Sequence, residues 1–194
     1  EKGDGVSQDF SEAAKWYRRA AEEVYDMHAQ YNLGLMYGKG RGVARDDAEA
    51  VKWYRLAVAQ GDADAQADLG LMYAEGRGVA RDYAEAVKWY RLAAAQGNAN
   101  AQFALGAMYA NGQGVARDDA EAVKWFRLAA EQGGPLAQAS LGVMYADGQG
   151  VARDYVRAHM WLNLAVANPE LSGFPDAFAR DFARERDALA RKMT

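Results

Sequence analysis

The chain repeats itself every 36 residues, and this period restricts its possible folds more than any other feature. The string Gly-Val-Ala-Arg-Asp begins at Gly42, Gly78, Gly114 and Gly150, always 36 residues apart. Residues 62–97 and 98–133 differ at only 10 of 36 positions. A repeat of this length cannot bury its own apolar surface, so consecutive repeats must stack. The period therefore predicts a stack of similar units.

The residues within each repeat favour two helices. Residues 62–74 and 82–96 are rich in Ala, Leu, Glu and Lys, which have high helix propensities. Asp82 is followed three residues later by Glu85, the pattern of a capping box, and Gly97 can provide the left-handed residue that ends many helices. We therefore predict an all-α fold, a right-handed α-solenoid of 36-residue helix–turn–helix repeats with a C-terminal capping helix.

The repeat register divides the chain into six segments of one continuous solenoid domain. They are a partial first repeat with its second helix only (1–25), four full repeats (26–61, 62–97, 98–133 and 134–169), and a loop with the capping helix (170–194). The helix of the partial repeat is expected over Phe10–Glu23 and is followed by a one-residue insertion near Val24 and Tyr25. The last full repeat leads through a loop over 168–175 to a capping helix over Asp176–Lys192.

Comparison of the copies separates two faces of the first helix of the repeat. Its unvarying positions fall on one arc of a helical wheel: Ala29, Gln30, Leu33, Gly34, Met36 and Tyr37. Its varying positions fall on a second arc: His28, Tyr31, Asn32, Leu35 and Lys39. A glycine inside a helix costs about 1 kcal/mol relative to alanine, so Gly34 predicts the close passage of another backbone. The unvarying arc is therefore predicted to be the interface between helices.

The second helix carries an apolar face and a charged face. Ala50, Tyr54 and Ala57 share the apolar face with Trp53. The whole tryptophan series is predicted to be core: Trp16, Trp53, Trp89, Trp125 and Trp161. The opposite face is predicted to be solvated, and it carries Glu49, Lys52 and Arg55, with the first two spaced as an ion pair.

The two ends of the array differ from its middle. In the last full repeat, Met160 stands where the other repeats have lysine. This substitution predicts that the capping helix covers Met160 through Phe178, Phe182 and Leu189. His159 is expected to be packed at the same covered end. The helix of the partial repeat has no predicted cover, so we expect an end that can associate with another chain.

Composition and charge exclude several functional classes. The chain has no cysteine, which excludes disulfides, thiolate catalysis and cysteine zinc sites. Its 23 basic and 27 acidic residues give a net charge of -4, which argues against a nucleic-acid-binding surface. No apolar run approaches the roughly 20 residues that cross a membrane, so no membrane insertion is expected. The first residue is Glu1 rather than Met, which leaves a fragment and a processed form both open.

Short motifs that resemble ligand sites lack the residues their chemistry requires. The Gly-Lys-Gly-Arg-Gly string at 38–42 follows a predicted helix, whereas phosphate loops follow a strand. The acidic residues within 62–68 lack the turn glycine and the bidentate glutamate of a calcium loop. The two histidines, His28 and His159, lie in different repeats. We therefore predict no catalytic residue, no metal and no cofactor.

One pattern recurs four times in register. In the second full repeat it reads Leu69-Gly70-x-Met72-Tyr73-x-x-Gly76-x-Gly78-Val79, followed by Asp82-x-x-x-Ala86-x-x-Trp89-Tyr90 and Ala93-Ala94. This pattern resembles the SEL-one-like repeat family, a relative of the tetratricopeptide repeats, and is most like its bacterial members. The resemblance implies that the first helix lines the concave side of the solenoid. It leaves the compartment unknown, with periplasmic or secreted slightly favoured over cytoplasmic.

The same resemblance implies a function in protein interaction. Members of the family are mostly adaptors in bacterial envelope biogenesis, signalling and host interaction, and in eukaryotic degradation of misfolded secretory proteins. We therefore expect a non-catalytic adaptor whose concave groove binds a protein or peptide partner. The expected contact residues are His28, Tyr31, Asn32, Leu35, Asp64, Asp68, Asn100, Phe103 and Ser140. Tyr31 and Phe103 are expected to be exposed aromatic anchors.

Two alternatives remain open. The first is a structural subunit of a larger assembly, formed through end-to-end stacking on the uncovered N-terminal helix. The resemblance also includes a cysteine-rich branch that is linked to β-lactam binding or hydrolysis. This chain lacks those cysteines, which makes the second alternative much the weaker.

Overall fold

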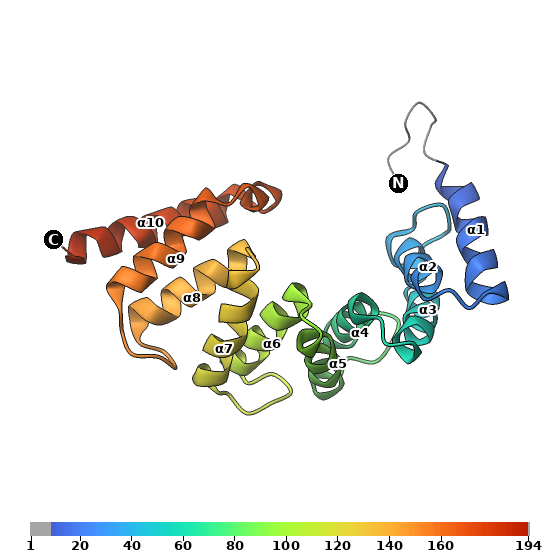
Figure 1. Ribbon diagram of the computed structural model, residues 1–194, viewed down its shortest axis with the longest axis horizontal. Helices are drawn as coiled ribbons and strands as arrows, with labels where there is room; N and C mark the ends of the chain where they lie inside the picture. The colour runs from blue at the N-terminus through green and yellow to red at the C-terminus, as the bar shows by residue number, and fades with distance from the viewer. Residues whose placement is uncertain (1–8, 194) are drawn as a thin grey trace. The chain divides into compact units, whose positions relative to one another are not determined.

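The computed structural model describes residues 9–193, without the side chains of residues 172 and 173. The chain separates into two compact units, unit 1 (Glu1–Gln96) and unit 2 (Gly97–Thr194). Residues 1–8 and 194, which belong to the predicted partial repeat and capping segment, lie outside the described residues. Within the described residues every regular element is a helix, and the helices pair in repeats of the predicted length (Figure 1). The predicted all-α class is therefore confirmed.

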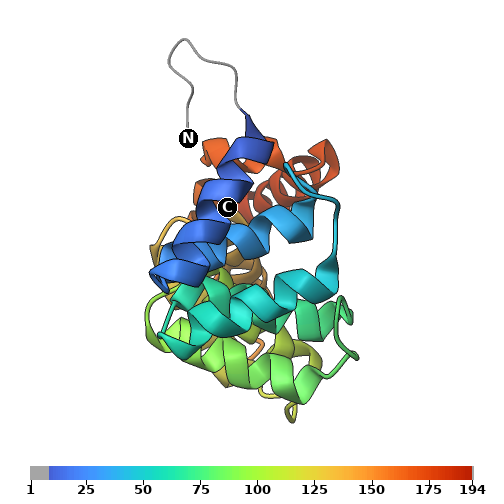
Figure 2. The ribbon, with the colours of Figure 1, turned by 90° about the vertical axis from the view of Figure 1, so that its right-hand side faces the viewer.

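Unit 1 contains one single helix and two helical pairs. Its helices are α1 (Phe10–Glu23), α2 (Met27–Lys39), α3 (Asp47–Ala59), α4 (Ala63–Glu75) and α5 (Tyr83–Ala95). The first helices of its repeats are α2 and α4, and the second helices are α1, α3 and α5. Each helix packs against the next along the chain, and Figure 2 shows α1, α2 and α3 in successive layers. The limits predicted for α4 and α5 are correct to within one residue at each end.

Unit 2 contains two helical pairs and the C-terminal helix. Its elements are α6 (Ala99–Asn111), α7 (Asp119–Glu131), α8 (Pro135–Asp147), α9 (Tyr155–Ala167), the 3₁₀ helix η1 (Pro169–Gly173) and α10 (Asp176–Met193). The first helices are α6 and α8, and the second helices are α7 and α9. The segment predicted as a loop over 168–175 contains η1, because Asn168 caps it by accepting a hydrogen bond from the Glu170 N–H at 2.9 Å.

Helix starts follow the predicted caps only in part. The Asp46 carboxylate accepts hydrogen bonds from the N–H groups of Ala48 and Glu49, each at 3.0 Å, at the start of α3. In a full capping box, Glu49 would bond back to the Asp46 N–H. That N–H instead donates to the Tyr37 carbonyl at 3.0 Å, and Glu49 pairs with Lys52. The box predicted at Asp82 and Glu85 is incomplete in the same way, because the Asp82 N–H donates to the Tyr73 carbonyl at 2.9 Å and Glu85 pairs with Lys88.

Helix ends follow the predicted glycines. Gly61 in unit 1 and Gly133 in unit 2 follow second helices with φ angles of 94° and 92°. At the predicted insertion, Tyr25 has a φ of 55°, the only positive value at a non-glycine position in the described residues. Side chains disfavour this conformation, so Tyr25 occupies a position that suits the glycine of the other repeats. Pro135 begins α8, as its predicted place at the first helical position requires.

Much of the core of each unit consists of positions that do not vary between repeats. Leu33 and Leu69 in unit 1, and Leu105 and Leu141 in unit 2, have no exposed surface. Burial of one leucine contributes about 1.5–3 kcal/mol, so these four side chains are major stabilising contributions. The alanine, glutamine, glycine and methionine positions of the same arc are also buried, and Tyr37 at its edge is half-buried. The predicted interface between helices is confirmed.

The prediction that the tryptophan series is core is wrong for Trp16 and correct only in part for the other four residues. Trp53 and Trp89 are half-buried in unit 1, Trp125 and Trp161 are half-buried in unit 2, and Trp16 is 60% exposed. Trp53 packs against the apolar cluster of α1 and α2, the helices that precede its own. A tryptophan of this series covers the contact between repeats with one part of its ring while another part reaches solvent. Among the described residues, no helix pair takes the corresponding place beside Trp16.

The helix glycines Gly34, Gly70 and Gly106 accommodate aromatic rings, and Gly142 accommodates the Leu162 side chain, rather than the backbone that the sequence predicts. A Cβ atom on Gly34 would lie 2.6 Å from the ring of Tyr54, and one on Gly70 would lie 2.9 Å from the ring of Tyr90. The backbone oxygen of Ala50 would lie 3.4 Å from the Gly34 Cβ. In the first three full repeats the two helices can therefore approach closely because an aromatic ring of the second helix lies directly on the glycine of the first.

Glutamine pairs join consecutive repeats within each unit. The Gln60 amide donates to Gln30 Oε1 at 2.8 Å and to the Tyr25 carbonyl at 2.9 Å. In unit 2, the Gln132 amide donates to Gln102 Oε1 at 2.7 Å. Gln30 and Gln102 are buried, and a buried amide without a partner is costly. These pairs therefore favour a single register between adjacent repeats.

Arginine–tyrosine hydrogen bonds form a second connection between repeats. Arg55 of α3 donates to the Tyr73 hydroxyl of α4 at 3.0 Å, and Arg127 of α7 donates to the Tyr145 hydroxyl of α8 at 2.9 Å. The face of the second helix predicted to be solvated does carry an exposed Glu–Lys ion pair in each of the first three full repeats. The prediction is wrong for Arg55, because its long side chain reaches the next repeat.

The C-terminal helix packs on α9 but leaves Met160 uncovered. In unit 2, Leu189 of α10 is fully buried and Phe182 is half-buried, in the same core as Leu162 of α9. Phe178 is 42% exposed and Met160 is 45% exposed. The predicted capping helix is present, but the prediction that it covers Met160 is wrong, because α10 packs on the side of α9 that carries Leu162.

Candidate protein-interaction surface

The candidate surface is the side of the first helices that does not enter the core, here called the first-helix face. In unit 1 it comprises His28, Tyr31, Asn32 and Leu35 of α2 with Asp64 and Asp68 of α4. In unit 2 it comprises Asn100 and Phe103 of α6 with Ser140 of α8. His28, Asp64 and Asn100 are exposed, and the other six residues are half-buried. All nine predicted contact residues therefore reach the surface of their own unit.

An N-terminal cap positions the first residues of this face in unit 1. The Asp62 carboxylate accepts a hydrogen bond from the Ala65 N–H at 2.7 Å and is nearly buried. Asp62 therefore caps α4, as the exclusion of a calcium loop implies. His28 of α2 approaches it, with Nδ1 3.9 Å from Asp62 Oδ2, while 76% of the His28 side chain remains exposed. An ion pair with protonated His28 would join α2 to the start of α4, but exposure keeps such pairs weak.

Tyr31 and Asp68 connect adjacent repeats on the unit 1 face. The Tyr31 ring packs on the ring of Tyr54 with centroids 5.9 Å apart, and its hydroxyl hydrogen-bonds to the Asp68 carboxylate. Burial raises the pKa of Asp68, while the Tyr31 hydrogen bond and the Lys39 charge lower that pKa in part. Burial, together with the charges of Asp68 and Asp64, also raises the pKa of Tyr31. The Tyr31 hydroxyl is therefore a protonated donor beside a half-buried carboxylate.

Tyr31 and Phe103 are not the exposed anchors that the sequence predicts. Each is half-buried at the margin of its unit's core. The Phe103 ring packs on the ring of Phe126 with centroids 5.6 Å apart. The sequence shows an aromatic side chain in a varying position but does not show the ring of the second helix beneath it. Because each ring packs on the core, its removal would lower stability as well as change the surface.

The unit 2 face carries no ionisable side chain at the positions that are acidic in unit 1. Asn100 and Ala104 of α6 stand where α4 has Asp64 and Asp68, and Ser140 of α8 stands at the second of these positions. The backbone arrangement is the same, since α4 and α6 each contain 13 residues between equivalent caps. The two faces therefore differ in charge and hydrogen-bonding capacity rather than in architecture.

Sequence comparison missed one apolar member of the face. Leu71 of α4 is 39% exposed and occupies the same position in its repeat as Leu35 of α2. The signal was present, because this position changes to Ala107 and Val143 in the other repeats. Leu71 therefore belongs with the unit 1 face by the same criterion that selected Leu35.

The described residues contain no cluster of side chains that resembles a metal centre. Across 9–193, no cluster of three or more His, Asp or Glu side chains could hold a metal ion. His159 is half-buried, as expected of a packed residue, and its Nδ1 lies 3.2 Å from the side-chain nitrogen of Asn163 on the same helix. In the same range, the helices are too short or too polar to cross a membrane.

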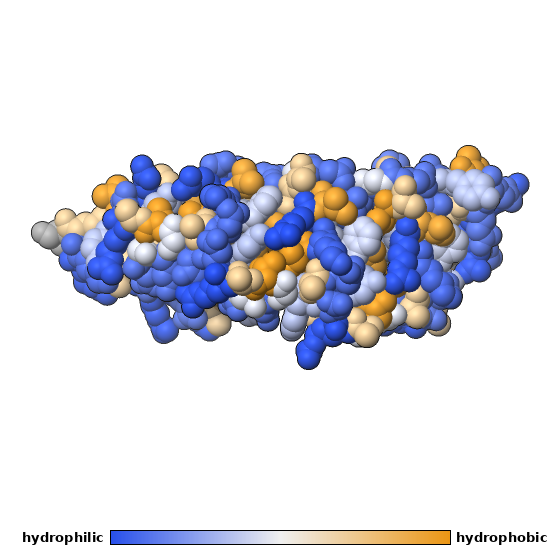
Figure 3. Space-filling model, turned by 90° about the horizontal axis from the view of Figure 1, so that it is seen from below, coloured by the Kyte–Doolittle hydropathy of each residue, from blue (hydrophilic) through white to orange (hydrophobic). Residues whose placement is uncertain are grey.

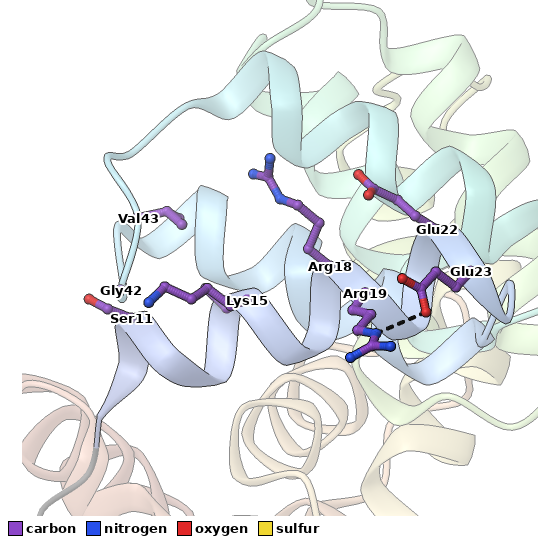
Figure 4. A pocket seen from close by; sticks show the side chains of 9 residues that line it. Ser11, Lys15, Arg18, Arg19, Glu22, Glu23, Gly42 and Val43 are labelled. Carbon is purple, nitrogen blue, oxygen red and sulfur yellow. Dashed lines mark hydrogen bonds and ion pairs between the residues drawn. The ribbon is translucent and has the colours of Figure 1, made fainter.

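A pocket of about 520 Å³ lies beside α1 and the loop that follows α2 (Figure 4). It is lined by charged side chains of α1, and the three cations among them already have partners. Lys15 Nζ lies 3.1 Å from a carboxylate oxygen of Glu12, and Arg19 Nε lies 2.9 Å from one of Glu23. Arg18 donates to the Tyr37 hydroxyl. Because these cations are neutralised or bonded within the chain, the pocket is a polar recess rather than an anion site.

Exposed apolar side chains are scattered over the surface, with one concentration on a second helix. Figure 3 shows a side of the molecule on which hydrophobic groups lie in patches separated by hydrophilic ones. In unit 2, three exposed apolar residues lie on α9 alone: Val156, Met160 and Leu164. This group does not belong to the first-helix face, which is formed by α6 and α8 in that unit.

Known proteins share both the repeat and the fold. The Sel1 repeat family matches residues 1–24, 28–62, 63–98, 99–134 and 135–168. The crystal structure of c5321, a protective antigen present in uropathogenic Escherichia coli strains and displaying an SLR fold, is 45% identical with a TM-score of 0.80. That match covers 84% of this chain and 35% of the antigen. A Sel1 repeat protein from Oxalobacter formigenes is 39% identical with a TM-score of 0.79, over 87% of this chain and 66% of that one.

A more distant structure shares the fold alone. Helicobacter pylori cysteine rich protein B is 24% identical with a TM-score of 0.53, over 70% of this chain and 97% of that one. Comparison with curated proteins gives no match. This chain therefore spans about a third of the Escherichia coli antigen and just under two thirds of the Oxalobacter protein. Because the family pattern matches five segments that together make up most of the sequence, the chain belongs to the Sel1 repeat family.

Proposed function

We propose that this chain is a non-catalytic adaptor that binds a protein or peptide partner on its first-helix face. The observation that carries the proposal is the division of each first helix into two sides. Most positions that do not vary between repeats are buried in the core, whereas most positions that vary reach the surface. The exceptions include the half-buried Tyr37 and the buried Ala67 and Ala139. Such a surface can be adapted to a partner without loss of packing between repeats. Membership of a family of helical-repeat scaffolds supports the same function.

The two units offer different chemistry to such a partner. In unit 1, Asp64 and Asp68 lie near the Tyr31 hydroxyl, a combination that suits hydrogen-bond donors and cationic groups. In unit 2, Asn100 offers an uncharged amide beside the half-buried ring of Phe103. A partner that contacts both faces would therefore meet a polar, acidic segment and a neutral one.

The proposal is tested by finding the partner and then altering exposed residues only. A pull-down with the purified chain, followed by mass spectrometry, identifies binding proteins. The dissociation constant is then measured for a variant with His28→Ala, Asp64→Ala and Asn100→Ala. All three residues are exposed, so the melting temperature should be unchanged. We expect at least a tenfold loss of affinity, which corresponds to about 1.4 kcal/mol.

The matched control changes three exposed residues on the second helices. A variant with Lys52→Ala, Lys88→Ala and Lys124→Ala removes side chains that are each about two thirds exposed. It should keep the affinity of the unaltered chain. The proposal fails if this control weakens binding as much as the first-helix variant does, or if the first-helix variant binds normally.

Trp16 favours a second candidate function, that of a structural subunit. Trp16 is 60% exposed, whereas Trp53, at the equivalent position of the next repeat, is half-buried against α1 and α2. We propose that a further helical repeat, supplied by the rest of the protein or by another chain, would cover Trp16 in the same way. Where another chain supplies it, Trp16→Ala should abolish association in sedimentation experiments. A chain that stays monomeric at every accessible concentration would exclude this candidate.

A further inference from the structure

Asn111, the last residue of α6 in unit 2, has a chemistry that the proposed function does not use. It is exposed and is followed directly by Gly112. Among the six asparagines of the chain it is the one that precedes a glycine. The others precede leucine, alanine or proline: Asn32, Asn98, Asn100, Asn163 and Asn168. A glycine has no side chain to shield its backbone nitrogen or to restrict its backbone, so this nitrogen can reach the side chain of the residue before it.

The reaction open to this pair is deamidation. Hydroxide removes the proton of the Gly112 backbone nitrogen, which then attacks the side-chain carbonyl carbon of Asn111. The new carbon–nitrogen bond closes a cyclic imide, while the bond from that carbon to the side-chain nitrogen breaks and ammonia leaves with a proton from water. A water molecule then opens the imide at either of its carbonyl carbons. The product is an aspartate or an isoaspartate, so water is consumed, ammonia is released, and no oxidant is required.

The end of α6 keeps the attacking nitrogen engaged. Gly112 has a left-handed φ of 66°, and its N–H donates to the Met108 carbonyl. The same carbonyl accepts from the Gln113 N–H at 3.0 Å. The Gly112 nitrogen can approach the Asn111 side chain only after this turn opens. Because helix ends open locally without unfolding of the whole domain, the opening of this turn should set the rate of deamidation.

The other repeats show that the end of α6 can accommodate an acidic residue. Glu75 ends α4 and Asp147 ends α8, and both are exposed. The glycine that follows each of them has a φ of 72°. The Gly148 N–H donates to the Met144 carbonyl at 2.9 Å, so the same helix end forms beside an aspartate. The aspartate product at position 111 should therefore leave the fold intact.

The new charge would arrive beside the first-helix face. In unit 1, Lys39 occupies the equivalent position of α2, and its charge acts on Asp68 of the next repeat. In unit 2, Asn111 stands in the place of Lys39, and Ser140 stands in the place of Asp68. An aspartate at position 111 would thus put a negative charge near a face whose equivalent positions carry no ionisable side chain.

We propose that Asn111 is a site of spontaneous deamidation, controlled by the last turn of α6, which makes the neutral first-helix face of unit 2 acidic as the protein ages. The consequence for binding rests on the proposed function, because a partner that contacts this face would meet a carboxylate instead of an amide. The chemical step itself does not depend on any partner. It is therefore tested on the chain alone, and its failure would leave the proposed function untouched.

Incubation of the full chain in mildly alkaline buffer, followed by ion-exchange chromatography and peptide mass mapping, tests the proposal. A more acidic species should accumulate, with deamidation at Asn111 at least tenfold faster than at any other asparagine. A synthetic peptide of residues 105–118 is too short to hold a stable helix end, so it should react at least tenfold faster than the folded chain. Asn111→Gln should abolish the acidic species, because the longer side chain forms a cyclic imide far more slowly.

The matched control moves the same pair of residues to unit 1. Glu75→Asn places an asparagine before Gly76, whose N–H donates to the Met72 carbonyl at the end of α4. This new asparagine should also react at least tenfold faster than the asparagines that do not precede glycine. Asn111→Asp should keep the helix content of the unaltered chain. The proposal is overturned if Asn111 reacts no faster than the other asparagines, if the folded chain reacts as fast as the peptide, or if Asn111→Asp loses helix content.

Discussion

The first-helix faces of the two units have the same backbone plan but different chemistry. In unit 1, an aromatic pair between the first and second helices carries two hydroxyl groups, those of Tyr31 and Tyr54, and Asp68 lies beside it. In unit 2, the equivalent pair is Phe103 and Phe126, without hydroxyls. The ring centroids are 5.9 and 5.6 Å apart. Each unit therefore conserves the contact between helices while the polar groups around it change.

This comparison separates what builds a repeat from what distinguishes one repeat from another. Beneath both faces lie the same buried leucines, such as Leu69 in unit 1 and Leu141 in unit 2. The packing requirement acts on one side of the helix only, because the other side has no helix above it in its own unit. Differences between the units should consequently appear in surface electrostatics and in polar contacts at the edge of the core.

The largest loss of stability is expected from substitution of a buried leucine, and it should be equal in the two units. Leu69→Ala and Leu141→Ala each remove a fully buried side chain, and each should lower the free energy of unfolding by about 2–5 kcal/mol. Urea denaturation followed by circular dichroism measures both. If one substitution lowers the free energy of unfolding by less than about 1 kcal/mol, the two cores are not equivalent. The two units then differ in packing as well as in surface chemistry.

A smaller loss of stability should follow from breaking the glutamine pair of unit 1. Gln60→Ala removes the donor to Gln30 Oε1, which lies 2.8 Å away. Because Gln30 is 2% exposed, its carbonyl oxygen would be left buried without a partner. The free energy of unfolding should fall by about 1–3 kcal/mol, measured by urea denaturation. Gln60→Glu offers a control, since it keeps the size of the side chain and the loss should be at least as large.

In the last repeat of unit 2, completing the glutamine pair should instead raise the free energy of unfolding. There Asn168 stands where the earlier repeats have glutamine, and its shorter amide donates to the Gly133 carbonyl at 2.6 Å. Gln138 Oε1 is buried without a hydrogen-bond partner in the described residues. Asn168→Gln should supply the missing donor and raise the free energy of unfolding by about 1 kcal/mol. A loss of stability would show that capping of η1 by Asn168 matters more than the completed pair.

Much of the fold could be predicted from the sequence because its signals are local. The limits of α4 and α5 follow to within one residue from the acidic N-caps and from glycines such as Gly97, which need only neighbouring residues to act. Internal repetition also identified the buried arc, since positions such as Leu33 cannot vary between copies without loss of packing. The exposure of Trp16 and of Met160 could not be predicted, because it depends on which helices lie beside α1 and α9.

The candidate surface was predictable in outline only. The helical wheel places His28 and Asp64 on the outer side of their helices, and the structure has both exposed. It does not predict the hydrogen bond of Tyr31 with Asp68, because that contact depends on how α2 and α4 are set by the helix between them. It likewise does not reveal that the Tyr31 ring is half-buried. The sequence pattern therefore predicts positions within one helix but does not predict contacts between repeats.

An ion pair between repeats should make the stability of unit 1 more sensitive to acid. Hydrogen bonds from Arg77 and then Arg45 lower the pKa of Asp47 to about 2, below the ordinary value of about 3.9. In the equivalent place in unit 2, Gln149 stands where unit 1 has Arg77. The folded-state pKa is depressed, so the stabilisation is present above about pH 4 and is lost as the pH falls toward 2.

Arg77→Gln reproduces the residue of unit 2 and tests this difference. The free energy of unfolding at pH 7 should fall by about 1 kcal/mol, a modest value because both Asp47 and Arg77 keep partial access to water. The unaltered and altered chains should then converge in stability as the pH is lowered toward 2, measured by urea denaturation at each pH. An unchanged difference at low pH would assign the effect to the Arg77 hydrogen bond to Gly38 rather than to the ion pair.

The smallest effect should come from the half-buried carboxylate of the unit 1 face. Burial raises the pKa of Asp68 above its ordinary value, so the folded state binds its proton more tightly than the unfolded state does. The carboxylate therefore costs stability as the pH rises through the unfolded value of about 3.9 and beyond. Asp68→Asn removes the charge but keeps an oxygen that can accept from Tyr31. It should raise the free energy of unfolding at pH 7 by about 0.5 kcal/mol or less, and the gain should vanish near pH 3. A variant that is less stable at pH 7 would show that attraction to Lys39 outweighs burial, and that the charge on this face is favourable to the fold as well as available to a partner.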